Sequence, residues 1–104
     1  MIVCVQNSTD GSDVTLLDAD DFHHFSVRLA GPGATEALPA HGIGRLINPA
    51  EAFVTVAAVR RLAGRDADAS WNEGFAAMLR YAQSRGWLSD DGSEIRAHLE
   101  SAAP

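Results

Sequence analysis

The sequence predicts an α+β fold, a small and mostly antiparallel sheet covered on one face by two to three helices, the main one over residues 71–85. Short apolar runs, some alternating with polar residues, fill the N-terminal part and are typical of half-buried strands. Near the C-terminus, apolar residues recur at steps of three and four, as on one face of a helix. A chain of 104 residues with 46% apolar and 21% charged residues also has the size and composition of a single domain, 1–104.

The N-terminal part is predicted to form three strands. Residues 2–6 and 14–17 are apolar runs on either side of a polar stretch that contains Asp10-Gly11, so we expect a hairpin. Residues 22–29 alternate between apolar and polar side chains, which predicts a third strand with one buried face. Gly31-Pro32-Gly33 ends this strand, because proline lacks a backbone donor and glycine permits turn conformations.

The middle of the chain carries competing signals for helix and strand. Asn48-Pro49-Ala50-Glu51 has the residue types of a helix start. Phe53-Val-Thr-Val56, however, is β-branched and aromatic and favours a strand, so we place a turn at 48–50. The elements expected here and beyond are a helix over 34–41 closed by Gly42, strands over 45–47 and 51–54, a helix capped by Thr55 and ended by Gly64, a turn over 89–92, and a segment over 94–100 that fits either a closing strand or a C-terminal helix.

The helix over 71–85 has both a start and a stop signal. Ser70 and Glu73 have the spacing of a capping box, in which side chains satisfy the free backbone N–H groups of the first turn. Gly86 is predicted to end the helix in the left-handed conformation, with Trp87 folding back on the last turn. These signals predict a helix from sequence but indicate no chemistry.

Charge and composition argue against nucleic-acid and membrane partners. The formal net charge is −6 and no basic tract occurs, whereas nucleic-acid binding depends on neutralised phosphates. The first apolar run stops at Gln6 without a basic lead, so we expect neither a signal peptide nor a spanning helix, and hence a cytoplasmic protein. Cys4 lies in an apolar run and is predicted to be a buried, inert thiol. Arginine without lysine indicates a high-GC, bacterial genome.

Histidines are the only candidates for chemistry that the sequence offers. His23 and His24 follow several aspartates, but adjacent strand residues point to opposite faces, so we expect no metal site. His24 and His98 are weak catalytic candidates, because they could lie across the sheet from each other near carboxylates. No cofactor is expected, since the glycines at 42–44 match neither phosphate-binding fingerprint and no N-terminal serine has a GxSxG setting.

The first of two remaining function classes is a non-enzymatic module for self-association or docking to another protein. In that case the aromatic side chains Trp71, Phe75 and Trp87 form an interface, for example in a homodimer. Core packing is the more frequent use of such side chains, because burial of each contributes roughly 1.5–3 kcal/mol.

The second class is a small acid/base enzyme or a protein that binds a small molecule. It uses His24 and His98 in a cleft between the sheet and the helices. A pocket that gathers these imidazoles or Tyr81 beside apolar walls is the observation that favours this class.

Overall fold

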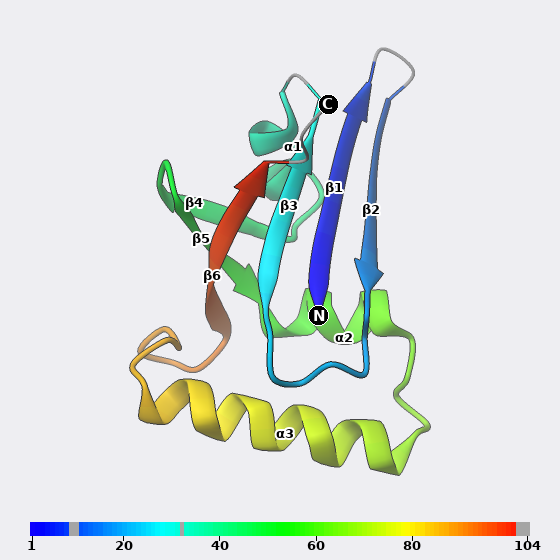
Figure 1. The fold of residues 1–104 in the computed structure, drawn as a ribbon, viewed down its shortest axis with the longest axis vertical. Coiled ribbons are helices and arrows are strands. Elements are labelled where there is room, and N and C mark those ends of the chain that lie inside the picture. The colour runs from blue at the N-terminus through cyan, green and yellow to red at the C-terminus, as the bar shows by residue number, and fades with distance from the viewer. Residues whose placement is uncertain (9–10, 32, 102–104) are drawn as a thin grey trace.

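A six-stranded sheet and three helices form the α+β fold of the computed structural model, which describes residues 1–8, 11–31 and 33–101 (Figure 1). The α+β part of the prediction is therefore confirmed. The elements in chain order are β1 (Ile2–Ser8), β2 (Gly11–Leu17), β3 (Ser26–Ala30), α1 (Ala34–Ala40), β4 (Gly44–Asn48), β5 (Glu51–Thr55), α2 (Val56–Ala63), α3 (Ala69–Ser84) and β6 (Glu94–Ser101).

The sheet is mixed, so the prediction of a mostly antiparallel sheet is wrong. Its strand order is β2-β1-β3-β6-β5-β4. β1 and β2 form the predicted antiparallel hairpin, but β3 runs parallel to β1 and β6 runs parallel to β3. The reason is that the loop 18–25 crosses from the end of β2 past the start of β1, so β3 begins beside Ile2 on the other side of β1 and runs in the same direction (Figure 1). β6 then inserts between β3 and β5. Strands from both halves of the chain thus build the sheet.

One predicted strand has different bounds in the structure, and one segment for which two structures were predicted is a strand. The third strand is shorter than predicted, because residues 22–25 belong to the loop that precedes Ser26. The segment over 94–100, which fitted a strand or a helix, is strand β6. Asp10 and Pro32, which were predicted to lie in turns, fall outside the described residues.

The two faces of the sheet differ in chemistry. One face, here called the inner face, is covered by α1 and α2, which lie behind the strands in Figure 1. The opposite, outer face carries ion pairs between strands, and Cys4 lies buried on it, as predicted. The fully buried strand residues of the inner face are Val3, Val5, Val27, Ala52 and Val54. The outer-face ion pairs are Arg28–Glu100 at 3.7 Å, Arg45–Glu94 at 3.3 Å and Arg96–Glu51 at 2.7 Å.

Most predicted helix ends of the middle region are confirmed. Thr55 caps α2, because its hydroxyl oxygen accepts a hydrogen bond from the backbone N–H of Ala58 at 3.1 Å. Gly64 ends the same helix with φ 62°. These caps depend on residues close in sequence, which is why local patterns predict them.

Asp68, and not Ser70, caps the N-terminus of α3. The Asp68 carboxylate accepts a hydrogen bond from the backbone N–H of Trp71 at 3.1 Å, and Ser70 already lies inside the helix. Arg65 also binds this carboxylate, with 2.6 Å between Nη2 and Oδ2. The pKa of Asp68 is lowered, first by hydrogen bonding from Arg65 and then by that from Trp71. The capping box at Ser70 is therefore a wrong prediction, because a charged acceptor stands two residues earlier.

α3 crosses the lower ends of the strands in Figure 1 instead of lying along the inner face. The indole Nε1–H of Trp71 donates to the carbonyl of Ala19 at 2.8 Å, which ties the helix to the loop 18–25. The helix thus closes one end of the core, and this corrects the expectation that all helices cover one face. Its buried side chains are Trp71, Phe75, Met78 and Ala82.

Candidate functional site

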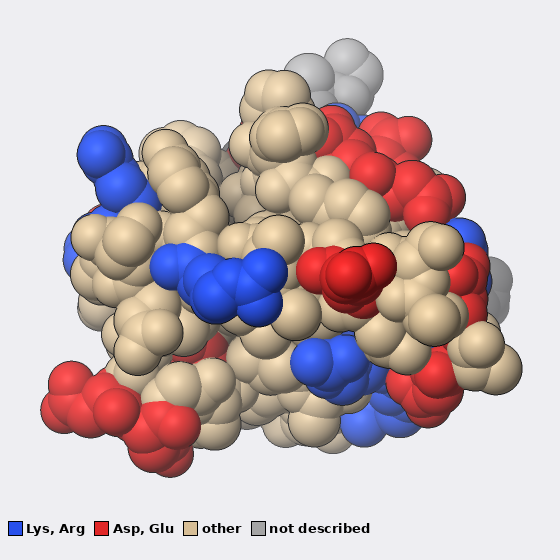
Figure 2. All heavy atoms as spheres, turned by 90° about the horizontal axis from the view of Figure 1, so that it is seen from below, with Lys and Arg blue, Asp and Glu red and all other residues tan. Residues whose placement is uncertain are grey.

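A groove of about 1010 Å³ opens where α3, the loop before β3 and the strand β6 meet. Figure 2 looks at the end of the molecule that α3 covers and shows acidic and basic side chains in small separate groups with uncharged surface between them. The larger apolar side chains that line the groove are Phe22, Phe25, Met78, Ile95 and Trp87. A concave site with mainly apolar walls and a few polar groups is the usual form of a small-molecule site.

The groove gathers the polar side chains that the sequence offered as candidates. His24, His98 and Tyr81 all line it. His98 lies on β6, where its register partners are Ser26 on β3 and Glu51 on β5. His24 is therefore not the cross-strand partner of His98, because it lies in the loop two residues before Ser26. The two imidazoles instead line one groove from different elements, one from the loop and one from the sheet.

Asp21 orients the ring of His24. The distance from His24 Nδ1 to Asp21 Oδ2 is 3.1 Å. The pKa of Asp21 is lowered, mainly because its carboxylate accepts a hydrogen bond from the backbone N–H of His23, and further because of the bond with His24. This contact holds the imidazole in one orientation at the mouth of the groove. The pair can therefore hydrogen-bond a polar group there.

A second charged pair forms a fixed part of the groove. Arg96 donates two hydrogen bonds to the Glu51 carboxylate, both at 2.7 Å. These bonds are the main reason that the pKa of Glu51 is lowered and that of Arg96 is raised. Because the two side chains bind each other in bidentate geometry, they offer a ligand a rigid surface, and His24, His98 and Tyr81 remain to provide hydrogen bonds.

Trp87 forms the outer wall of the groove beyond the end of α3. Its side chain is 40% exposed, and its ring contacts that of Tyr81 with 5.8 Å between centroids. Its backbone is held against β6, because the N–H of Arg96 donates to the carbonyl of Trp87 at 2.7 Å. The predicted helix stop is confirmed here, since Gly86 has φ 75° and the N–H of Trp87 donates to the carbonyl of Ala82 at 2.9 Å.

Asp91 stabilises the turn that connects Trp87 to β6. Because the bonding group is a carboxylate, its contribution to stability depends on pH. Its carboxylate accepts from the N–H of Ser93 and from the hydroxyls of Ser93 and Ser89, at 3.0, 2.7 and 2.8 Å, and its pKa falls from 3.8 to about 2. Because the pKa of Asp91 is lower in the folded protein than in the unfolded chain, the ionised carboxylate stabilises the fold at pH values above the pKa of the unfolded chain. This stabilisation is lost as the pH falls through the pKa of the folded protein.

Asp91→Asn is therefore expected to lower stability at pH 7 and to match the original chain once the pH has fallen from about 4 to about 2. Urea unfolding at a series of pH values measures the difference. Asp90→Asn is the matched control, because it removes a charge from the same turn but keeps this acceptor. A deficit of Asp91→Asn that stays constant down to the lowest pH would contradict the assignment.

Of the three aromatic side chains proposed as an interface, only Trp87 lies at the surface. Trp71 and Phe75 are buried within the single chain and stack on each other with 4.9 Å between ring centroids. They cannot contact a second molecule while the core stays closed.

Sequence reasoning missed the loop that lines the site. Phe22 and Phe25 were assigned to a strand, but they line the groove from the loop. Gly74 could have indicated that a side chain packs against α3, because a glycine inside a helix costs about 1 kcal/mol relative to alanine and so suggests a close neighbour. A Cβ at Gly74 would overlap the ring of Phe22, which packs there against the backbone of α3.

The fold also joins Ser12 to His41, with 2.5 Å between Oγ and Nε2. No sequence pattern connects these residues, which lie on β2 and directly after α1. Both are exposed, and neither lines the groove. This contact therefore gives no basis for a catalytic assignment.

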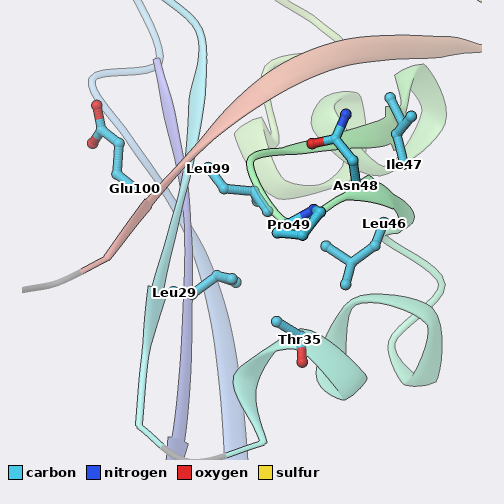
Figure 3. Close-up of a pocket in the computed structure, with 8 residues that line it drawn as sticks. All are labelled: Leu29, Thr35, Leu46, Ile47, Asn48, Pro49, Leu99 and Glu100. Carbon is cyan, nitrogen blue, oxygen red and sulfur yellow. The ribbon is translucent and has the colours of Figure 1, made fainter.

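A smaller pocket of about 590 Å³ lies on the inner side of the sheet (Figure 3). It is bordered by α1, by the ends of β3 and β6, and by the turn between β4 and β5. Leu29, Leu99 and Leu46 point into it. Its chemistry differs from that of the groove, because neither imidazole lines it.

Comparison of the chain with protein-family models, with curated proteins and with solved structures found no match. Within residues 1–8, 11–31 and 33–101, no group of three or more potential ligands could hold a metal ion. No helix in the described part of the chain is long and apolar enough to cross a membrane.

Proposed function

We propose that this chain is a non-enzymatic binding protein whose groove holds a small organic molecule with a ring-bearing, apolar body and a hydrogen-bonding head group. The observation that carries the proposal is that one groove combines aromatic walls with His24, His98 and Tyr81. Its volume of about 1010 Å³ is at the upper end of the range typical of small-molecule sites.

The two sides of the groove would bind different parts of the ligand. Trp87, which is 40% exposed, offers most of the apolar surface on the α3 side, where Met78 is 8% exposed. Covering such surface contributes roughly 25 cal/mol per Å². His98 stands on the sheet, beside the rigid pair of Arg96 and Glu51. A ligand would therefore place its ring near α3 and its head group near β6.

A titration followed by amide NMR tests the proposal with three matched probes: phenylacetate, phenylacetamide and 2-phenylethanol. We expect at least one probe to shift signals of residues 22–26, 74–82 and 95–100 selectively. His98→Ala should weaken that binding about fivefold to tenfold, because it removes one hydrogen-bonding partner of the head group. His41→Ala is the matched control and should leave the affinity unchanged. The proposal fails if no probe shifts these signals at millimolar concentration, or if both variants behave alike.

Self-association through the same groove is the second candidate. The exposed rings of Tyr81 and Trp87, which are 59% and 40% exposed, favour it because they adjoin the groove and form a small aromatic surface. Sedimentation over a range of protein concentrations distinguishes the two candidates. A dimer that Trp87→Ser dissociates would support self-association, whereas a monomer that binds a probe would support the small-molecule site.

A further inference from the structure

The pocket on the inner side of the sheet is an opening in the cover of the core. α1 covers the neighbouring strands but does not reach the turn between β4 and β5, so apolar side chains there remain uncovered. Leu46 and Ile47 on β4 are large apolar side chains, yet they are 42% and 37% exposed. In Figure 3, Leu29, Leu99 and Pro49 face Leu46 across a common space.

The polar side chains at this pocket are already bound to other groups of the protein. The hydroxyl of Thr35 donates to Glu36 at 3.1 Å. The amide of Asn48 donates to Glu51 at 3.1 Å and its oxygen accepts from the N–H of Ala50 at 2.8 Å.

The remaining polar side chain, Glu100, pairs with Arg28 at 3.7 Å and is directed away from the pocket in Figure 3. A charged or strongly polar group that entered would lose its water without gaining a side-chain partner. Such a loss is costly, whereas an apolar group would lose nothing by leaving water.

We propose that this pocket is a second binding site, separate from the groove, for an uncharged apolar molecule. Its volume of about 590 Å³ lies within the range of small-molecule sites and exceeds the space that one aromatic ring needs. The leucines on β3, β4 and β6 form its walls, so a ligand would replace the missing helical cover. The proposal rests on these walls and is independent of the function proposed for the groove.

Toluene and benzoate are a matched pair of probes, because they share a ring and differ in charge. We expect toluene to shift the methyl signals of Leu29, Leu46 and Leu99, and benzoate to bind there weaker by about tenfold or more. Equal affinity for the two probes at these leucines, or toluene shifts confined to Met78 and Trp87 in the groove, would overturn the proposal.

Two variants fill the pocket from opposite walls. Leu46→Phe enlarges a side chain that is already partly exposed, and Thr35→Leu narrows the pocket from α1; each should weaken toluene binding by about tenfold. Tyr81→Ser, in the groove, is the control and should leave it unchanged. If both filling variants fold, as judged by unchanged circular dichroism, and bind toluene as the original chain does, the proposal is wrong. Shifts of the same methyl signals on concentration of the protein without probe would also overturn it, because a second copy would then fill the site.

Discussion

Phe75→Ala is expected to lower the free energy of unfolding by about 3–5 kcal/mol. The ring of Phe75 is 0% exposed and stacks on Trp71 at 4.9 Å. The guanidinium of Arg60 lies 4.9 Å from the same ring centroid, so α2 and α3 meet at this side chain. Removing the ring leaves a cavity where α3 closes the core, and the surrounding backbone can fill it only in part.

Urea unfolding followed by circular dichroism measures this loss. Tyr81→Ala is the matched control, because Tyr81 is an aromatic residue of the same helix but is 59% exposed. We expect this control to cost less than about 1 kcal/mol, as is usual for surface substitutions. If Phe75→Ala also costs less than about 1 kcal/mol, α3 does not close the core as described.

Gly31→Ala has the second large expected effect, because two separate penalties meet at this residue. Gly31 ends β3 with φ 87°, a conformation that costs an L-residue about 1–2 kcal/mol. An added Cβ would in addition overlap the backbone carbonyl of Asn7 on β1, so the strands would have to separate. Overpacking of this kind adds about 1–3 kcal/mol.

Gly86→Ala separates the two penalties. Gly86 has φ 75°, but nothing lies within 4 Å of an added Cβ, so only the backbone strain applies. We expect Gly31→Ala to be less stable than Gly86→Ala by about 2 kcal/mol in the same unfolding assay. Equal losses would show that β1 and β3 are not packed as closely as the structure places them.

The elements that sequence patterns predicted correctly are those whose signals are local. Thr55, Gly64 and Gly86 act on backbone groups within a few residues, so their roles follow from the sequence nearby. Strand partners are not local. Nothing near Ile95 indicates that its strand inserts between β3 and β5, and the mixed sheet was therefore missed.

The candidate site was predictable in its residue types but not in its arrangement. His24 and His98 could be selected because imidazoles are scarce and lie beside carboxylates. Their relative placement depends on the loop before β3, because Phe22 and Phe25 lie in this loop and not in the sheet. Alternation alone assigned those two residues to a strand. The contact between Ser12 and His41 likewise depends on how α1 packs beside the β1–β2 hairpin.

The proposed function requires that the groove hold a molecule in one orientation. Nuclear Overhauser contacts between the protein and whichever of phenylacetate, phenylacetamide or 2-phenylethanol binds most tightly test this directly. We expect contacts from the ring protons to Trp87 and Met78, and a shift of the His98 ring signals as the head group binds. Ring contacts that go instead to Leu46 and Leu99, or a complete absence of contacts at saturating probe, would contradict the proposed function.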